Sequence, residues 1–293
     1  MAYRTERILI TTAVLLVGLG LIQMLNRGAQ AAGGALPPAL LWLMALVLVV
    51  LAGAGALWVS GGVPAEAPVG PKATGAPVRG PVVITGRAGL LLRMAVPMLM
   101  TAGFVLFMPL FDNGWVQAAV LVVAGASFGT LYWAQAHAVY PGDRYFWPAQ
   151  VVLNVLSHLT AFVVFSVIYG LKVRALLSGT AVGLVTGLLI YEMLWRDINW
   201  HRAMRLPVEG RRSTLALLTV ASSVVAGELT WGLNYWAALP ALVGGAFLLV
   251  TFYVLFGLTA HYADRTLTRN ILIEFSVVTA VSLGIILASA FSG

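Results

Sequence analysis

Cysteine is absent from this chain of 293 residues, which excludes disulfide bridges, thiolate catalysis and cysteine-bound metal or iron–sulfur centres. Charge is also scarce, because 9% of the residues are charged, against about 25% in a typical soluble domain. The only two lysines, Lys72 and Lys172, fall in predicted connections between apolar runs. A retinal protein forms its Schiff base with a lysine inside a membrane helix, so this class is excluded as well.

Hydrophobic residues, by contrast, make up 60% of the chain and give it a mean hydropathy of +0.94. They gather in runs that approach or exceed the ~20 residues with which a helix crosses the hydrocarbon core of a bilayer. Nine runs are predicted to span a membrane: residues 8–25, 38–59, 89–110, 115–136, 148–170, 175–195, 214–235, 239–259 and 270–290. The sequence therefore predicts an all-α fold, a polytopic transmembrane helical bundle whose partner is the lipid bilayer.

The loop at residues 196–212 sets the predicted topology, because it carries five arginines between two apolar runs. Short loops rich in Lys and Arg stay in the cytoplasm. Counting outward through nine spans puts the N-terminus in the cytoplasm and the C-terminus outside, and leaves only three of the seventeen basic residues outside: Arg27, Lys172 and Arg174. We expect a multi-pass protein of the bacterial plasma (inner) membrane. A cleaved first span is the alternative, but that run exceeds the usual apolar core of a signal peptide, about 7 to 15 residues.

Residues 61–88 interrupt the apolar pattern with five prolines and six glycines. A segment of this composition buries too little apolar surface to order itself, so we interpret it as a flexible cytoplasmic linker. It divides the chain into an N-terminal two-helix hairpin at 1–60 and a seven-helix bundle at 89–293. Within the bundle, Pro97 and Pro109 are expected to kink or end the span at 89–110.

Glycines four residues apart mark two of the spans. In lipid, helices associate through close approach of their backbones, and small residues at this spacing permit it. The predicted helix-packing residues are Gly125 and Gly129 in one span and Gly179, Gly183 and Gly187 in another. Such spacing fits packing within the bundle and also a homo-oligomer seam, and the sequence leaves both open.

Glu228 is the most conspicuous polar residue, because it lies in the outer part of the span at 214–235, where an ionised carboxylate is costly unless it is paired. Trp231 lies one turn further on the same helical face, and Asn234 follows. His158 and Asn154 form a second polar pair, one turn apart, near the middle of another span. We take all five as binding candidates, and the alternative for each is a polar group satisfied by a neighbouring helix.

Motifs of intrinsic enzymatic chemistry are missing. The chain contains no G-x-S-x-G, no H-E-x-x-H and no phosphate-binding glycine loop, so no catalytic residue, metal ligand set or cofactor is predicted. His137 and His261 match in depth near the inner surface, which keeps a haem held between them as a remote alternative. The basic residues do not gather on one module, so nucleic acid is not expected as a partner.

The stretches Gly227–Trp231, Phe252–Leu255 and Leu267–Arg269, followed by Glu274 and Phe275, resemble a bacterial family of multi-pass membrane proteins without an assigned function, of the kind seen in Chloroflexi-like genomes. The resemblance covers about the last third of the chain. It implies a membrane location and transfers no catalytic residue.

Two functions compete on these observations. The first is a non-enzymatic carrier or channel-like protein for a small solute or lipid, with Glu228, Asn234 and His158 along a polar path. The second is a structural or assembly subunit that meets a membrane-complex partner through its glycine faces. A cavity that reaches Glu228 favours the carrier, and a flat lipid-facing surface of small residues favours the subunit.

Overall fold

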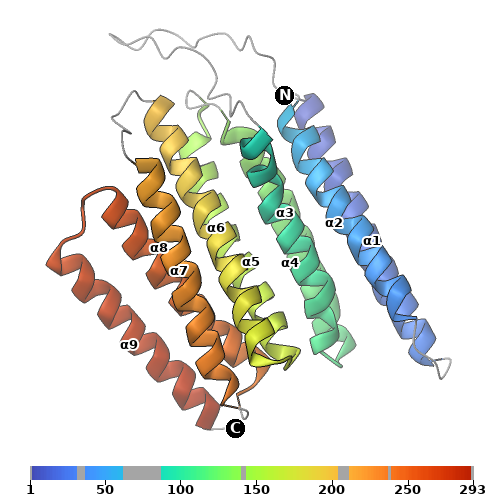
Figure 1. Ribbon diagram of the computed structural model, residues 1–293. Helices are drawn as coiled ribbons and strands as arrows, with labels where there is room; N and C mark the ends of the chain where they lie inside the picture. Colours follow the sequence, from blue (N-terminus) through green and yellow to red (C-terminus); the bar gives the residue numbers. More distant parts are fainter. Residues whose placement is uncertain are drawn as a thin grey trace. The chain divides into compact units, whose positions relative to one another are not determined.

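A computed structural model describes residues 2–31, 37–61, 87–139, 143–203, 211–236 and 239–291. Over these ranges the chain forms nine α-helices and one short 3-10 turn, with no strand (Figure 1). The helices are α1 (Ala2–Ala31), α2 (Pro38–Gly61), α3 (Arg87–Phe107), α4 (Gly114–His137), α5 (Phe146–Gly170), α6 (Ala175–Ala203), α7 (Arg211–Asn234), α8 (Ala241–Ala263) and α9 (Arg269–Phe291), and the 3-10 turn is η1 (Met108–Leu110). The predicted all-α fold is confirmed.

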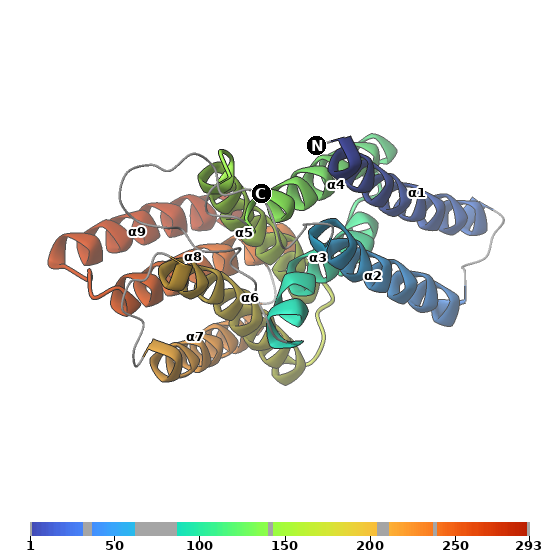
Figure 2. The same ribbon diagram turned by 90° about the horizontal axis from the view of Figure 1, so that it is seen from above.

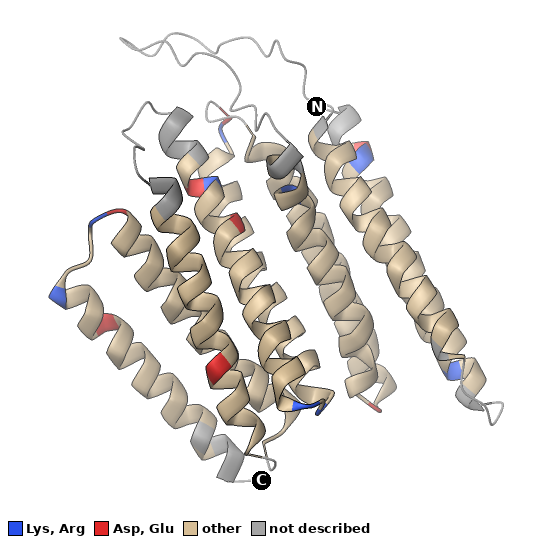
Figure 3. Cartoon of the chain, in the orientation of Figure 1, with Lys and Arg blue, Asp and Glu red and all other residues tan. Residues whose placement is uncertain are grey.

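Each of the nine described helices is long and apolar enough to cross a membrane. Helices suit this environment because every backbone polar group inside a helix is satisfied within the same segment. Charged side chains are rare along the middle of most helices (Figure 3). The predicted helical bundle with nine spans is confirmed in these terms.

Pro97 lies inside α3, and the helix continues through it. A proline has no N–H to donate to the carbonyl four residues earlier, which here belongs to Arg93. The side-chain amide of Gln135, in α4, donates a hydrogen bond to this carbonyl at 3.0 Å. A neighbouring helix thus replaces the missing donor. Pro109 lies in η1, the turn in which the α3 segment ends.

Side chains and backbone also define where helices begin and end. The side chain of Asn113 caps α4 by accepting a hydrogen bond from a backbone N–H of its first turn at 2.9 Å. At the end of α8, Arg265 has a φ of 55°, in the left-handed region. The N–H of Thr266 donates back to the carbonyl of His261 at 2.9 Å, as in the common left-handed closure of a helix.

The described chain forms two compact units, with the division inside α5 at residue 156. In the first unit α1 packs on α2 and α4, and α2 packs on α3 (Figure 2). The hydroxyl of Tyr132, in α4, donates to the carbonyl of Ala52, in α2, at 2.9 Å, and both residues are fully buried. The helices predicted as a separate hairpin, residues 1–60, therefore pack on α3 and α4. The predicted linker falls almost wholly on residues 62–86, which lie outside the described ranges.

The second unit contains the rest of α5 and helices α6 to α9. Tyr169, buried near the end of α5, donates through its hydroxyl to the carbonyls of Leu233 at 3.3 Å and Trp236 at 3.1 Å, where α7 ends. Its ring fills the space beside Gly244, where a Cβ would collide with it, so α8 approaches α5 closely. The contacts of α7 with α8 and of α8 with α9 complete the unit.

Candidate functional site: a groove between α6 and α7

Helices α6 and α7 approach each other through their backbones. A Cβ built on Gly179 would lie 2.9 Å from the carbonyl oxygen of Gly227, and one on Gly183 would lie 2.8 Å from the carbonyl oxygen of Ser223. Ordinary van der Waals contact begins at 3.4 Å, so neither position has room for a side chain. A Cβ on Gly187 would meet the hydroxyl of Ser223. All three glycines of α6 thus face α7, within one unit of the fold.

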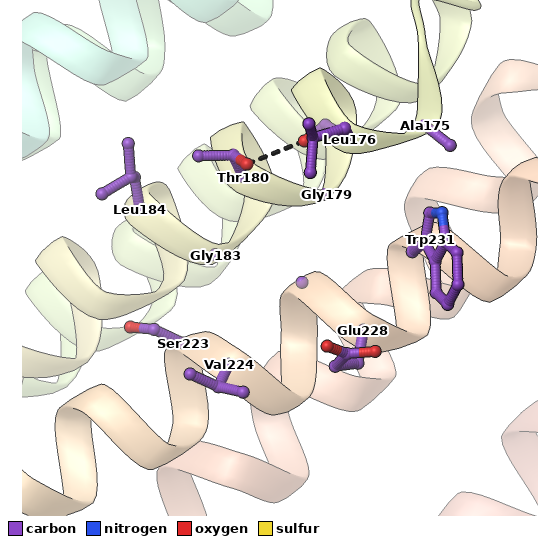
Figure 4. A pocket seen from close by; sticks show the side chains of 11 residues that line it. Ala175, Leu176, Gly179, Thr180, Gly183, Leu184, Ser223, Val224, Glu228 and Trp231 are labelled. Carbon is purple, nitrogen blue, oxygen red and sulfur yellow. Dashed lines mark hydrogen bonds between the residues drawn. The ribbon is translucent and has the colours of Figure 1, made fainter.

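A groove of about 490 Å³ runs beside this crossing (Figure 4). Because the two backbones approach closely, the larger side chains of both helices lie along the edges of the groove. Leu176 and Leu184, which are 76% and 70% exposed, belong to the α6 side. The groove is lined by Ala175, Leu176, Gly179, Thr180, Gly183, Leu184, Ser223, Val224, Gly227, Glu228 and Trp231. Its lining is therefore largely apolar, with a single carboxylate.

The hydroxyls that line the groove are already committed within their own helices. Thr180 donates to the carbonyl of Leu176 at 2.7 Å, and Ser223 donates to the carbonyl of Thr219 at 2.9 Å. Each hydroxyl keeps acceptor capacity but has used its one proton. The carboxylate of Glu228 is thus the strongest polar group that the groove offers to a ligand.

Glu228 itself is exposed, and no hydrogen bond or ion pair joins its side chain to another residue in the described part of the chain. It lies six residues before Asn234, the last residue of α7, which is about 9 Å at 1.5 Å per residue. Ionisable side chains within membrane spans usually pair with one another or face a polar interior. Glu228 pairs with no other residue of the described chain, and its carboxylate borders the groove.

Trp231 lies one turn beyond Glu228 and lines the same groove. It is 48% exposed, and its ring makes an edge contact with Tyr235 at a centroid distance of 5.7 Å. Exposed Trp and Tyr side chains near helix ends mark the boundary between hydrocarbon and headgroups. This aromatic pair predicts a membrane surface near this end of the groove.

Asn234, the third candidate on α7, does not line the groove. Its amide donates to the hydroxyl of Ser178, in α6, at 2.7 Å and to the carbonyl of Thr230 at 2.8 Å. The bond to Ser178 joins the end of α7 to the beginning of α6, and the bond to Thr230 lies within α7. The structure places Asn234 in a helix–helix contact, and it brings only Glu228 and Trp231 of the five candidates together.

His158 and Asn154 lie elsewhere. The ring of His158 packs against three aromatic rings of α8: Phe252 at 5.1 Å, Tyr253 at 6.0 Å and Phe256 at 5.8 Å between centroids. Asn154 is exposed on the part of α5 that belongs to the first unit. Glu228 and Asn234 lie on α7 and the ring of His158 packs against α8, so the polar path through these three residues stays a prediction.

A family comparison adds to this geometry. Residues 26–289 match a family described as Protein of unknown function (DUF5656). The chain belongs to this family. The resemblance to an uncharacterised family is thus confirmed, and the match reaches far beyond the last third of the chain, whereas the Chloroflexi-like origin stays a prediction. No curated protein and no solved structure matches the chain.

Further ionisable groups of this DUF5656 member lie away from the groove. Glu192 and Arg196 form an ion pair of 2.8 Å along α6, and their side chains are 8% and 11% exposed. His137 uses Nδ1 for the carbonyl of Trp133, and His261 uses Nδ1 for the hydroxyl of Thr266. No group of three or more His, Asp or Glu residues suited to a metal occurs among the described residues. The remote alternative of a haem held between the two histidines stays a prediction.

The remaining predicted packing residues, Gly125 and Gly129, lie in the first unit, where α4 faces α1. A Cβ on Gly125 would fall 2.8 Å from the side chain of Leu16, and one on Gly129 would lie 3.9 Å from Thr12. Sequence reasoning did not single out Thr180, Leu184 and Val224 of the groove. Their only signal is their position beside the small residues of α6 and α7, and it becomes readable once the two helices are known to cross.

Proposed function

We propose that this DUF5656 protein is a non-enzymatic carrier in the bacterial inner membrane that binds a small lipid-like molecule in the groove between α6 and α7. One observation carries the proposal: an exposed carboxylate, Glu228, lines a largely apolar groove inside a predicted membrane span. Ligand sites are typically concave and mostly apolar, with a few polar groups that fix orientation. The groove has this character.

The dimensions of the groove support a lipid-like occupant. Its lining runs from Ala175 to Leu184 along α6, which is about 13 Å at 1.5 Å per residue. One leaflet of the hydrocarbon core is about 15 Å thick. A molecule with one apolar chain therefore matches the groove in length and in character, while a hydrated solute finds few partners there.

The predicted topology places the Glu228 end of the groove at the outer surface. The loop at 196–212 would lie in the cytoplasm and the C-terminus outside, as the distribution of basic residues indicates. Under this proposal the groove takes its ligand from the outer leaflet of the membrane.

Filling the groove tests the proposal. In Val224→Trp the larger side chain occupies the groove, whereas Val220→Trp places the same side chain one turn earlier on α7, where it is exposed and outside the groove. We expect native mass spectrometry of the protein purified with its lipids to show a bound small molecule in the parent and in Val220→Trp. The molecule should be lost in Val224→Trp.

A bound molecule that persists in Val224→Trp, with unchanged stoichiometry, would contradict the carrier proposal. The melting temperature of both variants in detergent serves as the control for folding. It should agree between them, because both replaced side chains are exposed.

The assembly subunit remains the second candidate because of α9. This helix packs on α8, and its outward positions carry exposed apolar side chains together with the exposed carboxylate of Glu274. A helix of a partner protein would cover these apolar side chains as well as lipid does. Co-purification of a membrane protein at fixed stoichiometry, lost in Glu274→Leu and kept in Val224→Trp, would support this reading.

A further inference from the structure

The groove has a polar end and an apolar end. Its polar end carries Trp231 and, one turn earlier on α7, Glu228, whereas its apolar end carries Leu184 and Val224. Because α6 and α7 are antiparallel, Gly179 faces Gly227 and Gly183 faces Ser223, which fixes this order along both helices. In the predicted topology, the polar and apolar ends of the groove are therefore ordered as in a lipid of the outer leaflet, with the head group at the surface and the chain toward the midplane.

The acidic group at the polar end is Glu228, and no ion pair joins it to a neighbouring cation among the described residues. The ammonium of Lys172 donates to the carbonyl of Leu239 at 3.1 Å and lies 4.2 Å from the ring centre of Tyr169. The guanidinium of Arg174, which directly precedes the groove residue Ala175, is exposed and forms no ion pair with Glu228. Within the described residues, no ion pair reaches Glu228. A carboxylate at the edge of hydrocarbon attracts a cation strongly, because the surroundings screen charge less than water does.

Trp231 adds a second feature that favours a cation. A tryptophan ring attracts an ammonium group to its face, and this interaction is stronger where water is partly excluded. The Trp231 ring makes an edge contact with Tyr235, which lies one turn further along the chain, on the opposite side of Trp231 from Glu228. A carboxylate followed one turn later by an aromatic ring is a combination that suits a protonated amine, and neither group suits a phosphate.

We infer that the ligand of the α6–α7 groove is an amphipathic amine, a protonated amino head on a single apolar chain. The head pairs with Glu228 beside Trp231, and the chain lies along Gly179 and Gly183 toward Leu184. This inference rests on the proposed function and adds the chemical class of the ligand. The occupant is a lipid-like amine and not a partner helix, because the groove holds one carboxylate at its polar end and the hydroxyls further along it, of Thr180 and Ser223, donate within their own helices.

The test uses two photoreactive probes that differ only in the head group: a twelve-carbon primary amine and the matching alcohol, each with a diazirine near the end of the chain. Both are added to the full-length protein in phosphatidylcholine nanodiscs, and the labelled residues are mapped by mass spectrometry. We expect the amine to label the apolar end of the groove, around Leu184 and Val224. Labelling by the alcohol should be weaker by a factor of about ten or more, because the alcohol cannot form a charge-assisted hydrogen bond with Glu228.

Glu228→Gln keeps the shape of the side chain and removes its charge. It should reduce labelling by the amine to the level of the alcohol and leave labelling by the alcohol unchanged. Glu274→Gln is the matched control, since Glu274 is also exposed and lies five residues from an end of its helix, α9, but lines no part of the groove. It should change neither probe.

The outcomes separate the inference from the function on which it rests. If both probes label the groove equally and Glu228→Gln changes neither, the groove binds lipid-like molecules without preference for an amine, and the inference is wrong while the carrier proposal stands. If neither probe labels the groove in the parent, the carrier proposal itself is overturned.

Discussion

Gly183→Ala tests the helix crossing that forms the groove, because it adds one methyl group at the closest point. The added Cβ would lie 2.8 Å from the carbonyl oxygen of Ser223 and 3.6 Å from its carbonyl carbon. Reaching ordinary contact at 3.4 Å requires a shift of about half an ångström. A carbonyl oxygen belongs to the helix backbone and cannot rotate away, so one whole helix has to move.

The expected cost follows from this geometry. Adding a methyl group to a well-packed contact destabilises a protein by about 1–3 kcal/mol. Close packing is the main attraction between helices in lipid, so little else opposes their separation. Gly187→Ala should cost less, because its Cβ meets only the hydroxyl of Ser223, which can rotate. Gly183→Leu should cost more than Gly183→Ala, since three further carbon atoms follow the first.

The measurement is unfolding by sodium dodecyl sulfate in mixed micelles, followed by circular dichroism. Gly232→Ala is the matched control, because it lies in α7 with nothing within 4 Å of its Cβ position. There the change should be neutral or should stabilise the helix by up to about 1 kcal/mol. Equal unfolding curves for Gly183→Ala and Gly232→Ala would refute the close approach of α6 and α7.

Three further predictions concern the rest of the fold. Tyr169→Phe removes the hydroxyl that joins α5 to the end of α7 and should cost about 0.5–1.5 kcal/mol in the same unfolding assay. Gln135→Leu removes the donor to the Arg93 carbonyl and should cost about 1–3 kcal/mol, because Pro97 has no N–H that could replace this donor. Because the chain lacks cysteine, a single introduced cysteine reports on which side of the membrane its loop lies. Val173→Cys should react with an impermeant maleimide in intact cells, and Thr266→Cys should react only after the cells are permeabilised. The reverse pattern would overturn the predicted orientation.

The spans were predictable because hydrocarbon imposes a length and a composition on every helix that crosses it. The residues at which helices begin and end were less predictable. The apolar run at 8–25 belongs to α1, which extends from Ala2 to Ala31, since a helix continues beyond the bilayer for as long as its backbone bonds are made. Hydropathy indicates which residues lie in lipid, and it contains little information about the turns outside.

The glycine pattern illustrates a second limit. Gly179 and Gly183 mark a face that allows close approach, but one sequence does not show which helix lies opposite. The structure supplies that partner, Gly227 and Ser223 of α7. The groove follows from the crossing angle and from the exposed side chains beside it, so its apolar lining residues had no recognisable signal in the sequence.

Glu228 and Asn234 show why residue type alone does not identify a site. Both are polar, both lie on the last turns of α7, and the sequence presents both as binding candidates. The amide of Asn234 has two partners within the unit, Ser178 and Thr230, so its polarity is used in holding α6 and α7 together. The carboxylate of Glu228 has none among the described residues, and it borders a groove. A polar group at the edge of a membrane is costly until something satisfies it, and of the two residues only Glu228 leaves its side chain open to the groove.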